Sequence, residues 1–405
     1  MSTRPRPRST PPAIRRLTSG LAMPLGSVLL AFVVDGLLVG VTGGNPFAAY
    51  GALLCGGFGF ICTQGENPVL QISNTIVFVI PLITTGVAVA LPFRAGLFNI
   101  GAEGQLLAGA IACTAIGIKF SSLPSPILLP MVLIGGMVAG ALWAGVAGVL
   151  KATIGAHEVV TTIMMNYVAQ WFLRYLIVGG PLQLAPGTSK SSPIGAGARL
   201  ATVLPNDNTL IIFGLPSSVY RVHTGLLIAL AAAAIFAFLL WRTSLGYEIR
   251  AVGQSQKAAR YAGVSVRRTI IVTMLIAGAF SGLAGATEIA GVDHNLTDKY
   301  FSDSTGFDAI AVALLGLGSG VGIVLAAILF GALHAGGSVM QADANISGNL
   351  VFILQALILF SIAANFVGAI RQRIPGLARP PTALPPEMPP AAPMMTEAAV
   401  PPVES

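Results

Sequence analysis

The segment from Val69 to Leu91 reads VLQISNTIVFVIPLITTGVAVAL and contains no charged residue. A helix of that length rises about 35 Å, enough to cross the roughly 30 Å hydrocarbon core of a bilayer. Apolar runs of this kind recur along the chain, in which 54% of the residues are hydrophobic and only 9% are charged. An average soluble domain carries roughly 25% charged residues. The sequence therefore predicts an all-α, polytopic transmembrane helical bundle.

About ten segments are predicted to cross the membrane, each roughly 20 residues long except the eighth. The predicted spans are residues 20–41, 69–91, 97–118, 127–150, 159–178, 224–241, 269–292, 307–317, 321–340 and 350–370. The eighth is too short to cross as one straight helix, and a re-entrant course there would change the count. Residues 46–62 are apolar but short and glycine-rich, which is typical of a helix at the membrane interface.

The three cysteines of the chain are Cys55, Cys62 and Cys113. All three lie in apolar sequence, where a free thiol behaves as a small hydrophobic group. We therefore interpret them as buried, inert thiols, and expect neither a disulfide framework nor a metal site. The histidines, His334 among them, are scattered and show no metal-ligand spacing.

Lysine and arginine gather at residues 4–16, 242–268 and 371–379. Such clusters are typical of the cytoplasmic flanks of membrane helices. With ten crossings, both termini and the loop at 242–268 are predicted to be cytoplasmic, and the loop at 181–222 external. The net charge of +7 does not indicate a nucleic-acid partner, because the basic residues do not form a surface interleaved with aromatic residues.

These boundaries divide the chain into three parts. Residues 1–19 are a basic cytoplasmic tail, and residues 20–371 are the transmembrane permease domain. Residues 372–405 are rich in proline and alanine without periodicity, so they are predicted to form a disordered cytoplasmic tail.

Two segments interrupt the apolar pattern with glycines and polar groups. They are LPFRAGLFNIGAEGQLLAG at 91–109 and STGFDAIAVALLGLGSGVG at 304–322. Glycine-interrupted segments in the two halves of a transporter point to discontinuous helices and a midplane site, and ionisable groups inside a span tend to face a cavity. The predicted substrate-pathway residues are Phe98, Asn99, Glu103, Gln105, Asn166 and Asp308. Alternatively, the glycines only pack helices and Glu103 lies near a hydrated helix end. Asn74 and Asn166 would line the bundle interior in either case, and both are expected to hydrogen-bond between helices.

The basic loop reads TSLGYEIRAVGQSQKAARYAGVSVRR from Thr243. Ser255 is a predicted N-cap, residues 256–262 a two-turn helix, and Gly263 its stop. Ala258, Ala259 and Ala262 would give this helix a small-residue face suited to a groove on a soluble partner. The alternative is a positively charged membrane anchor. The predicted coupling residues are Arg250, Gly253, Lys257, Ala258, Ala259, Arg260, Tyr261 and Gly263.

Motifs for nucleotide chemistry are absent from the sequence. No glycine precedes any lysine, so there is no Walker A loop to hold phosphates. No nucleophile elbow or metalloprotease motif occurs either. We expect no catalytic residue, no metal and no cofactor, and we expect any ATP hydrolysis to take place on a separate chain.

Five further stretches carry a recognisable pattern. They are FRAGLFNIGAEGQ at 93–105, HEVVTTIMMNYVA at 157–169, TSLGYEIRAVGQSQKAARYAGVS at 243–265, SGLAGATEIAG at 281–291 and GFDAIAVALLG at 306–316. On these residues the chain resembles the permease subunits of bacterial ABC importers of the branched-chain amino acid and simple-sugar type. FNIGAEGQ makes it similar to the nucleoside-uptake permeases within that group. The resemblance covers about residues 20–370.

The resemblance implies a permease of the bacterial inner membrane that pairs with a second, homologous permease as a heterodimer. It further implies a cytoplasmic ABC ATPase subunit and an extracytoplasmic substrate-binding protein or lipoprotein. In such importers a helix with the pattern E-A-A-x-x-x-G inserts into the ATPase. Ala258, Ala259 and Gly263 match that pattern, and Lys257 stands where it has glutamate.

The expected function is translocation of nucleosides by alternating access. Two alternatives stay open: a permease for simple, ribose-like sugars, and a self-sufficient secondary transporter or channel. Proton coupling is disfavoured because the spans hold no repeated ionisable pairs. A membrane enzyme is disfavoured because no catalytic constellation occurs.

Overall fold

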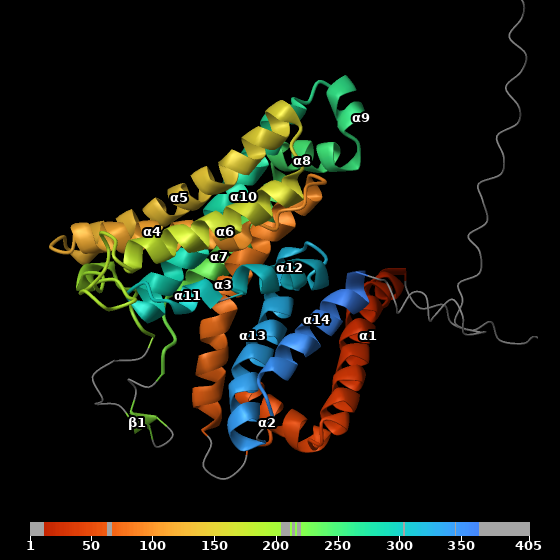
Figure 1. Cartoon of the computed structure of the whole chain (residues 1–405). Coiled ribbons are helices and arrows are strands. Elements are labelled where there is room, and N and C mark those ends of the chain that lie inside the picture. The colour runs from red at the N-terminus through yellow and green to blue at the C-terminus, as the bar shows by residue number, and fades with distance from the viewer. Residues whose placement is uncertain are drawn as a thin grey trace, which may run out of the picture.

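The computed structural model describes residues 12–363 except 63–66, 204–210, 213–214, 217–219, 303 and 345. The predicted C-terminal tail, most of the N-terminal tail and the end of the tenth predicted span lie outside the described residues. Figure 1 shows a molecule built almost wholly from helices, which confirms the all-α prediction. In the described part, the strands are a two-residue antiparallel pair, β1 (Ile211–Ile212) and β2 (Leu215–Pro216).

The helices follow the apolar runs of the sequence, and α1 begins at Pro12, inside the predicted tail. They are α1 (Pro12–Val41), α2 (Pro46–Phe58), α3 (Pro68–Arg94), α4 (Ala102–Lys119), α5 (Ser125–Ile154), α6 (Glu158–Ile177), η1 (Ala196–Ala198), α7 (Gly225–Arg242), α8 (Ser244–Gln254), α9 (Gln256–Tyr261), α10 (Val266–Glu288), η3 (Ile289–Asp293), α11 (Lys299–Ser302), α12 (Thr305–Leu315), α13 (Gly320–Asp343) and α14 (Asn349–Ala363).

Among the described residues, five helices are long and apolar enough to cross a membrane. They are α3, α5, α7, α10 with its π-helical continuation η3, and α13. This confirms a helical membrane bundle. The count of ten spans and the sides of the two termini stay predictions.

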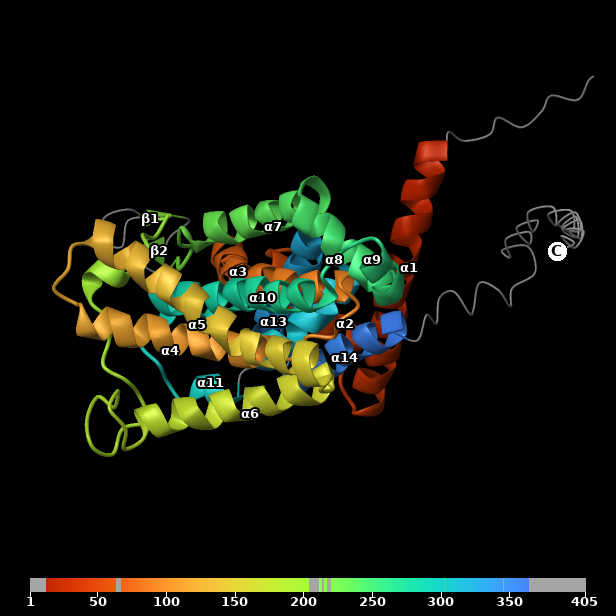
Figure 2. The same cartoon turned by 90° about the horizontal axis from the view of Figure 1, so that it is seen from above.

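One group of helices runs side by side and defines two ends of the bundle. Figure 2 shows α4, α5, α6, α7 and α10 with β1 and β2 at one end and α8 and α9 at the other. We call these the loop end and the α9 end. α5 and α10 approach closely through glycines, since a Cβ atom on Gly278 would lie 2.2 Å from the backbone oxygen of Gly140. Small residues at such crossings let backbones touch.

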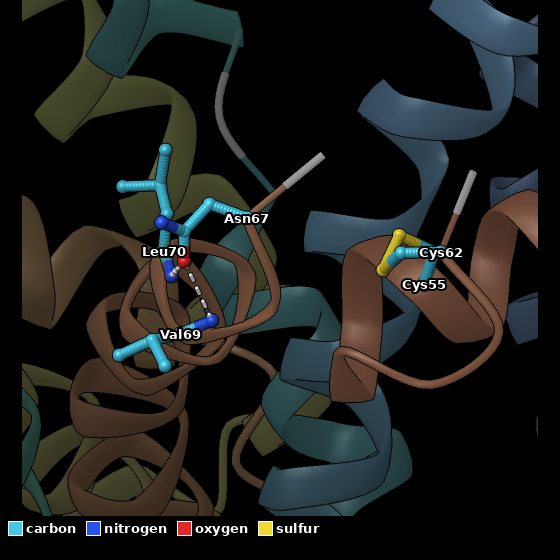
Figure 3. Close-up of a disulfide and its surroundings, with 5 residues drawn as sticks. All are labelled: Cys55, Cys62, Asn67, Val69 and Leu70. Carbon is cyan, nitrogen blue, oxygen red and sulfur yellow. Dashed lines mark hydrogen bonds between the residues drawn. A yellow bond between two sulfur atoms is a disulfide. The ribbon is translucent and has the colours of Figure 1, made fainter. Parts of the chain in front are cut away.

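A second group contains α1, α2, α13, α14 and the first half of α3 (Figure 1). Here the prediction of three inert thiols is wrong for Cys55 and Cys62, which form a disulfide (Figure 3). α2 ends at Phe58, and Gly59 takes a positive φ of 71° that turns the chain back. The turn brings Cys62 beside Cys55, with a Cα–Cα distance of 4.7 Å. Cys113 is free and buried, as predicted.

The helices are discontinuous at the first glycine-rich segment. α3 ends at Arg94, and residues 95–101 return into the bundle before α4 begins at Ala102. The third predicted span, at 97–118, therefore starts five residues too early, because side-chain hydrogen bonds hold residues 99–101 out of the helix. α12 has 11 residues and is too short to cross alone.

Candidate functional site

A cavity of about 300 Å³ lies between α3, α12, α13 and the end of α10 with η3. α3 supplies one face with residues at every third or fourth position: Asn74, Val77, Phe78, Pro81 and Leu82. The residues from α12 and α13 follow the same spacing: Thr305, Asp308, His334, Ala335 and Ser338. A concave site that mixes apolar and convergent polar groups is typical of small-molecule binding.

Two rings meet in this cavity. The Phe78 and His334 ring centroids lie 4.4 Å apart with the planes tilted by 42°. Phe352 of α14 lies edge-on to His334, at 6.1 Å between centroids. The aromatic pair comes from α3 and α13, which are far apart in sequence, so only the tertiary fold assembles it.

Charged groups line the side of the cavity nearest the loop end. Lys299 Nζ lies 2.6 Å from Asp293 Oδ2 and 3.6 Å from Glu288 Oε1. The Tyr300 hydroxyl donates to Asp293 Oδ2 at 2.5 Å. Asp308 lines the same cavity from α12. The described residues hold no group of three or more histidine, cysteine or acidic side chains placed to bind a metal ion.

Of the six predicted substrate-pathway residues, only Asp308 lines this cavity. Asn99 and Gln105 are buried and bond to each other, with Gln105 Nε2 donating to Asn99 Oδ1 at 2.9 Å. Asn166 accepts from the Gly104 backbone at 2.8 Å and donates to the Ile100 carbonyl at 2.9 Å. Phe98 is 40% exposed and contacts Phe93. A direct contact between cargo and these residues stays a prediction.

Glu103 joins the two discontinuous segments. Its side chain is fully buried in the first turn of α4, and Oε2 accepts a hydrogen bond from the Gly306 backbone of α12 at 2.6 Å. The carboxylate therefore lies at the N-terminal ends of two helices, where helix dipoles favour negative charge. Gly306 is required there, because a Cβ atom would lie 2.3 Å from the Glu103 backbone nitrogen. We name the side chains of Asn99, Glu103, Gln105 and Asn166 the break network.

The short helix of the basic loop forms as predicted, one residue shorter. Ser255 Oγ accepts from the Ala258 backbone at 3.3 Å, α9 ends at Tyr261, and Gly263 has a φ of 83°. The small-residue face is divided, however. Ala258 is exposed, whereas Ala259 is only 3% exposed and packs inside the chain. Tyr261 is 93% exposed.

Gly253 and Arg250 of α8 contact neighbouring helices of the chain, although Gly253 is exposed and Arg250 is partly exposed. A Cβ atom on Gly253 would lie 2.1 Å from the Arg94 carbonyl oxygen. Arg94 Nη2 in turn donates to the carbonyls of Leu317 and Gly318, at 2.8 and 3.0 Å. Arg94 thus links α8 to the turn that ends α12. In the sequence, Arg94 lies in the glycine-rich segment at 91–109, and nothing there indicates these partners.

At the loop end, His223 packs against η3. Its ring would lie 2.3 Å from a Cβ atom on Gly291, and its Nδ1 accepts from the Gly225 backbone at 3.1 Å. Burial, and secondarily the nearby charge of His294, lowers the pKa of His223 to about 4. A neutral His223 therefore packs next to the wall that Val292 and Asp293 give to the cavity.

Comparison with known proteins identifies the family. The family model described as branched-chain amino acid transport system / permease component matches residues 71–363. The chain is 40% identical over 353 residues to the guanosine ABC transporter permease protein NupP of Bacillus subtilis, covering 87% of this chain and 95% of that protein.

Two further relatives cover similar shares. The glucose ABC transporter permease protein TsgB13 of Haloferax volcanii is 37% identical over 365 residues, 89% of this chain and 90% of that protein. The nucleoside ABC transporter permease protein NupB of Lactococcus lactis is 35% identical over 357 residues, 86% of this chain and 92% of that protein. No solved structure matches. The chain belongs to the family of membrane permease components of the branched-chain amino acid transport type.

Proposed function

We propose that the chain is the permease subunit of an ABC importer for nucleosides, and that the cavity between α3, α12 and α13 is its cargo site. The observation that carries this is the Phe78–His334 ring pair next to carboxylates in one cavity. A nucleoside has a flat aromatic base and hydroxyl donors. Base–aromatic stacking is worth about 1–3 kcal/mol, and Asp308 could accept from ribose hydroxyls.

The names of the relatives support nucleosides over sugars, because two of the three concern guanosine or nucleosides. The sugar alternative rests on the glucose permease, at 37% identity. Sugars also use carboxylates and aromatic rings, so the cavity alone does not separate the two cargo classes. Uptake assays separate them. Our proposal predicts uptake of labelled guanosine that unlabelled glucose does not inhibit, and the alternative predicts uptake of labelled glucose that unlabelled guanosine does not inhibit.

A matched pair of variants tests the cavity. In cells that lack other nucleoside uptake, Phe78→Ala should lower labelled guanosine uptake at low concentration by about 5- to 150-fold, the equivalent of one lost stack. Phe238→Ala removes the same ring from the exposed side of α7 and should retain uptake. Equal uptake by both variants, with equal amounts in the membrane, would exclude Phe78 from the cargo site.

We also propose which side of the membrane each end of the bundle faces and which proteins bind there. The α9 end carries the Lys- and Arg-rich loop and would face the cytoplasm of a bacterial cell. The exposed residues Lys257, Ala258, Arg260, Tyr261 and Gly263 would then contact a separate ATPase subunit. The loop end would receive cargo from an extracytoplasmic binding protein, and a second homologous permease would complete the pathway. Contact of Arg250, Gly253 and Ala259 with the ATPase has less support, because Ala259 is buried and the other two contact α7 or α3 of their own chain.

Arg94 offers a route for coupling. ATPase-driven motion of α9 would pass through α8 to Arg94 and then to the Leu317–Gly318 turn, which ends the helix that carries Asp308. Tyr261→Ala should therefore reduce co-purification of the ATPase, whereas Tyr175→Ala, which removes another exposed tyrosine on α6, should not. Gradient-driven transport by the purified chain alone would favour a secondary transporter instead.

A further inference from the structure

A second cavity, of about 560 Å³, lies at the α9 end between the last turn of α3, the last turn of α7 and α8. The described residues that line it include Arg94, Trp241, Tyr247 and Arg250, and none of them is a carboxylate. It is separate from the cargo cavity, with which it shares no lining residue.

Two guanidinium groups stack on one indole in this cavity. The Cζ atoms of Arg250 and Arg94 lie 4.5 and 5.9 Å from the centroid of Trp241. Stacking uses the faces of the guanidinium planes and leaves their edges for hydrogen bonds to anions.

Neither positive charge is in direct contact with a carboxylate in the described part of the chain. Their three hydrogen bonds there go to backbone carbonyls, of Leu317 and Gly318 for Arg94 and of Gly246 for Arg250. The salt bridges among described residues involve neither arginine. Two adjacent cations held only by neutral groups favour an anionic ligand between them.

The place of the cavity indicates where that anion comes from. Trp241 is 54% exposed and continues one exposed apolar side of α7, formed by Leu227, Leu230, Ile235 and Phe238. In a membrane protein such a side faces acyl chains, and tryptophan, tyrosine and arginine at its end mark the level of the lipid headgroups. The cavity thus opens where apolar surface gives way to water.

We propose that this cavity binds the phosphodiester headgroup of an anionic phospholipid, with Arg94 and Arg250 contacting the phosphate oxygens and the acyl chains lying along α7. Basic pockets between membrane helices bind anionic headgroups in this way. Because Arg94 also bonds to the turn after α12, the bound lipid would brace the junction between α8 and the cargo-cavity helix. The proposal requires membrane placement but not a particular cargo.

The test uses Trp241 as the reporter. The full-length chain with Trp143→Phe and Trp171→Phe keeps only this tryptophan. It is placed in zwitterionic nanodiscs that contain a series of fractions of brominated phosphatidylglycerol or brominated phosphatidylcholine. The anionic lipid should quench Trp241 with a clearly higher apparent affinity, by about fivefold for each arginine.

Charge variants establish which side chains are responsible. Arg250→Gln should lower the ratio of apparent affinities for the anionic and the zwitterionic lipid by about fivefold. Arg250→Lys should retain most of this ratio. The matched control Arg268→Gln removes the same charge from the same end but outside the cavity, and should retain the preference. Equal quenching by the two lipids, or equal loss in Arg250→Gln and Arg268→Gln, overturns the proposal.

Two further arms identify the source of the anion. If millimolar inorganic phosphate abolishes the preference, the cavity takes a small anion and the lipid proposal fails. A photo-crosslinking residue in place of Tyr247 in whole cells should give an adduct of phospholipid mass. An adduct to a protein instead would assign the cavity to a partner subunit and overturn the proposal.

Discussion

The break network and the cavity between α3, α12 and α13, which is the proposed cargo site, both place polar side chains inside a membrane bundle. They differ in what those side chains contact. In the break network, Asn99, Gln105 and Asn166 are at most 2% exposed and bond to each other or to backbone groups. In the cavity, Asp308 and Lys299 border open space. Buried polar groups whose hydrogen bonds are all made within the protein hold helices in place. Polar groups that line a cavity can also bind cargo.

The largest effect should come from Gly306, where the two broken segments touch. Gly306→Val would place a branched side chain against the Glu103 backbone, so we expect loss of about 4 kcal/mol or more of stability and loss of uptake. Thermal unfolding in detergent measures it. Gly51→Val is the control, because nothing lies within 4 Å of a Cβ atom there. Equal unfolding temperatures for the two variants would contradict the close contact.

Asn166→Ala should lower stability by about 2–3 kcal/mol, because the Gly104 and Ile100 backbone groups lose their partner inside the bundle. Uptake of every cargo should fall together, with the KM of the remaining activity unchanged. Thr161→Ala, at a half-buried position on the same helix, is the control. A rise in KM for one cargo with unchanged stability would place Asn166 in the cargo site. The break network and the cavity would then no longer differ in function.

Asp308→Asn should change KM and leave stability unchanged, the opposite of Asn166→Ala. It keeps the size of the side chain but removes the charge that strengthens a hydrogen bond to a hydroxyl, so the KM for nucleosides should rise about tenfold, equivalent to about 1.4 kcal/mol. The unfolding temperature should stay close to that of the unmodified chain. The kinetics of labelled uptake give KM, and a large loss of stability without a change in KM would move Asp308 into the break network.

The smallest expected effect concerns the wall at the loop end. His223 has a folded-state pKa of about 4, below the ordinary 6.5, so its contribution to stability is complete above pH 6.5 and falls as pH decreases toward 4. Between pH 7 and 5.5 the loss should be about 1 kcal/mol. Unfolding measured in detergent at both pH values tests this. His223→Gln should remove the part of the pH dependence of stability that His223 contributes. An unchanged slope in the variant would show that His223 does not contribute.

Local features were predictable from the sequence because they depend on neighbours in the chain. The apolar runs predicted the helices, the glycine-rich segment at 91–109 predicted the break, and Ser255 and Gly263 predicted both ends of α9. The wrong prediction for Cys55 and Cys62 also has a local cause. The apolar context indicates buried thiols, but it does not reveal the turn at Gly59 that brings the two thiols together.

The cavity was not predictable in the same way. α3 is buried on most of its surface, so no amphipathic pattern marks the face that carries Asn74 and Phe78. His334 looked like one of several scattered histidines until α13 placed it against Phe78. Polarity within a span pointed to Asp308, which lines the cavity, and also to the break network, because spacing does not reveal which polar residues the fold brings to a cavity.

Photo-crosslinking of an azido-substituted purine nucleoside to the assembled transporter tests the central claim most directly. Peptide mapping should find the label on α3 around Phe78 or on α13 between His334 and Ser338. Label on residues 97–105 or on α6 around Asn166 would contradict the account, because cargo would then contact the break network.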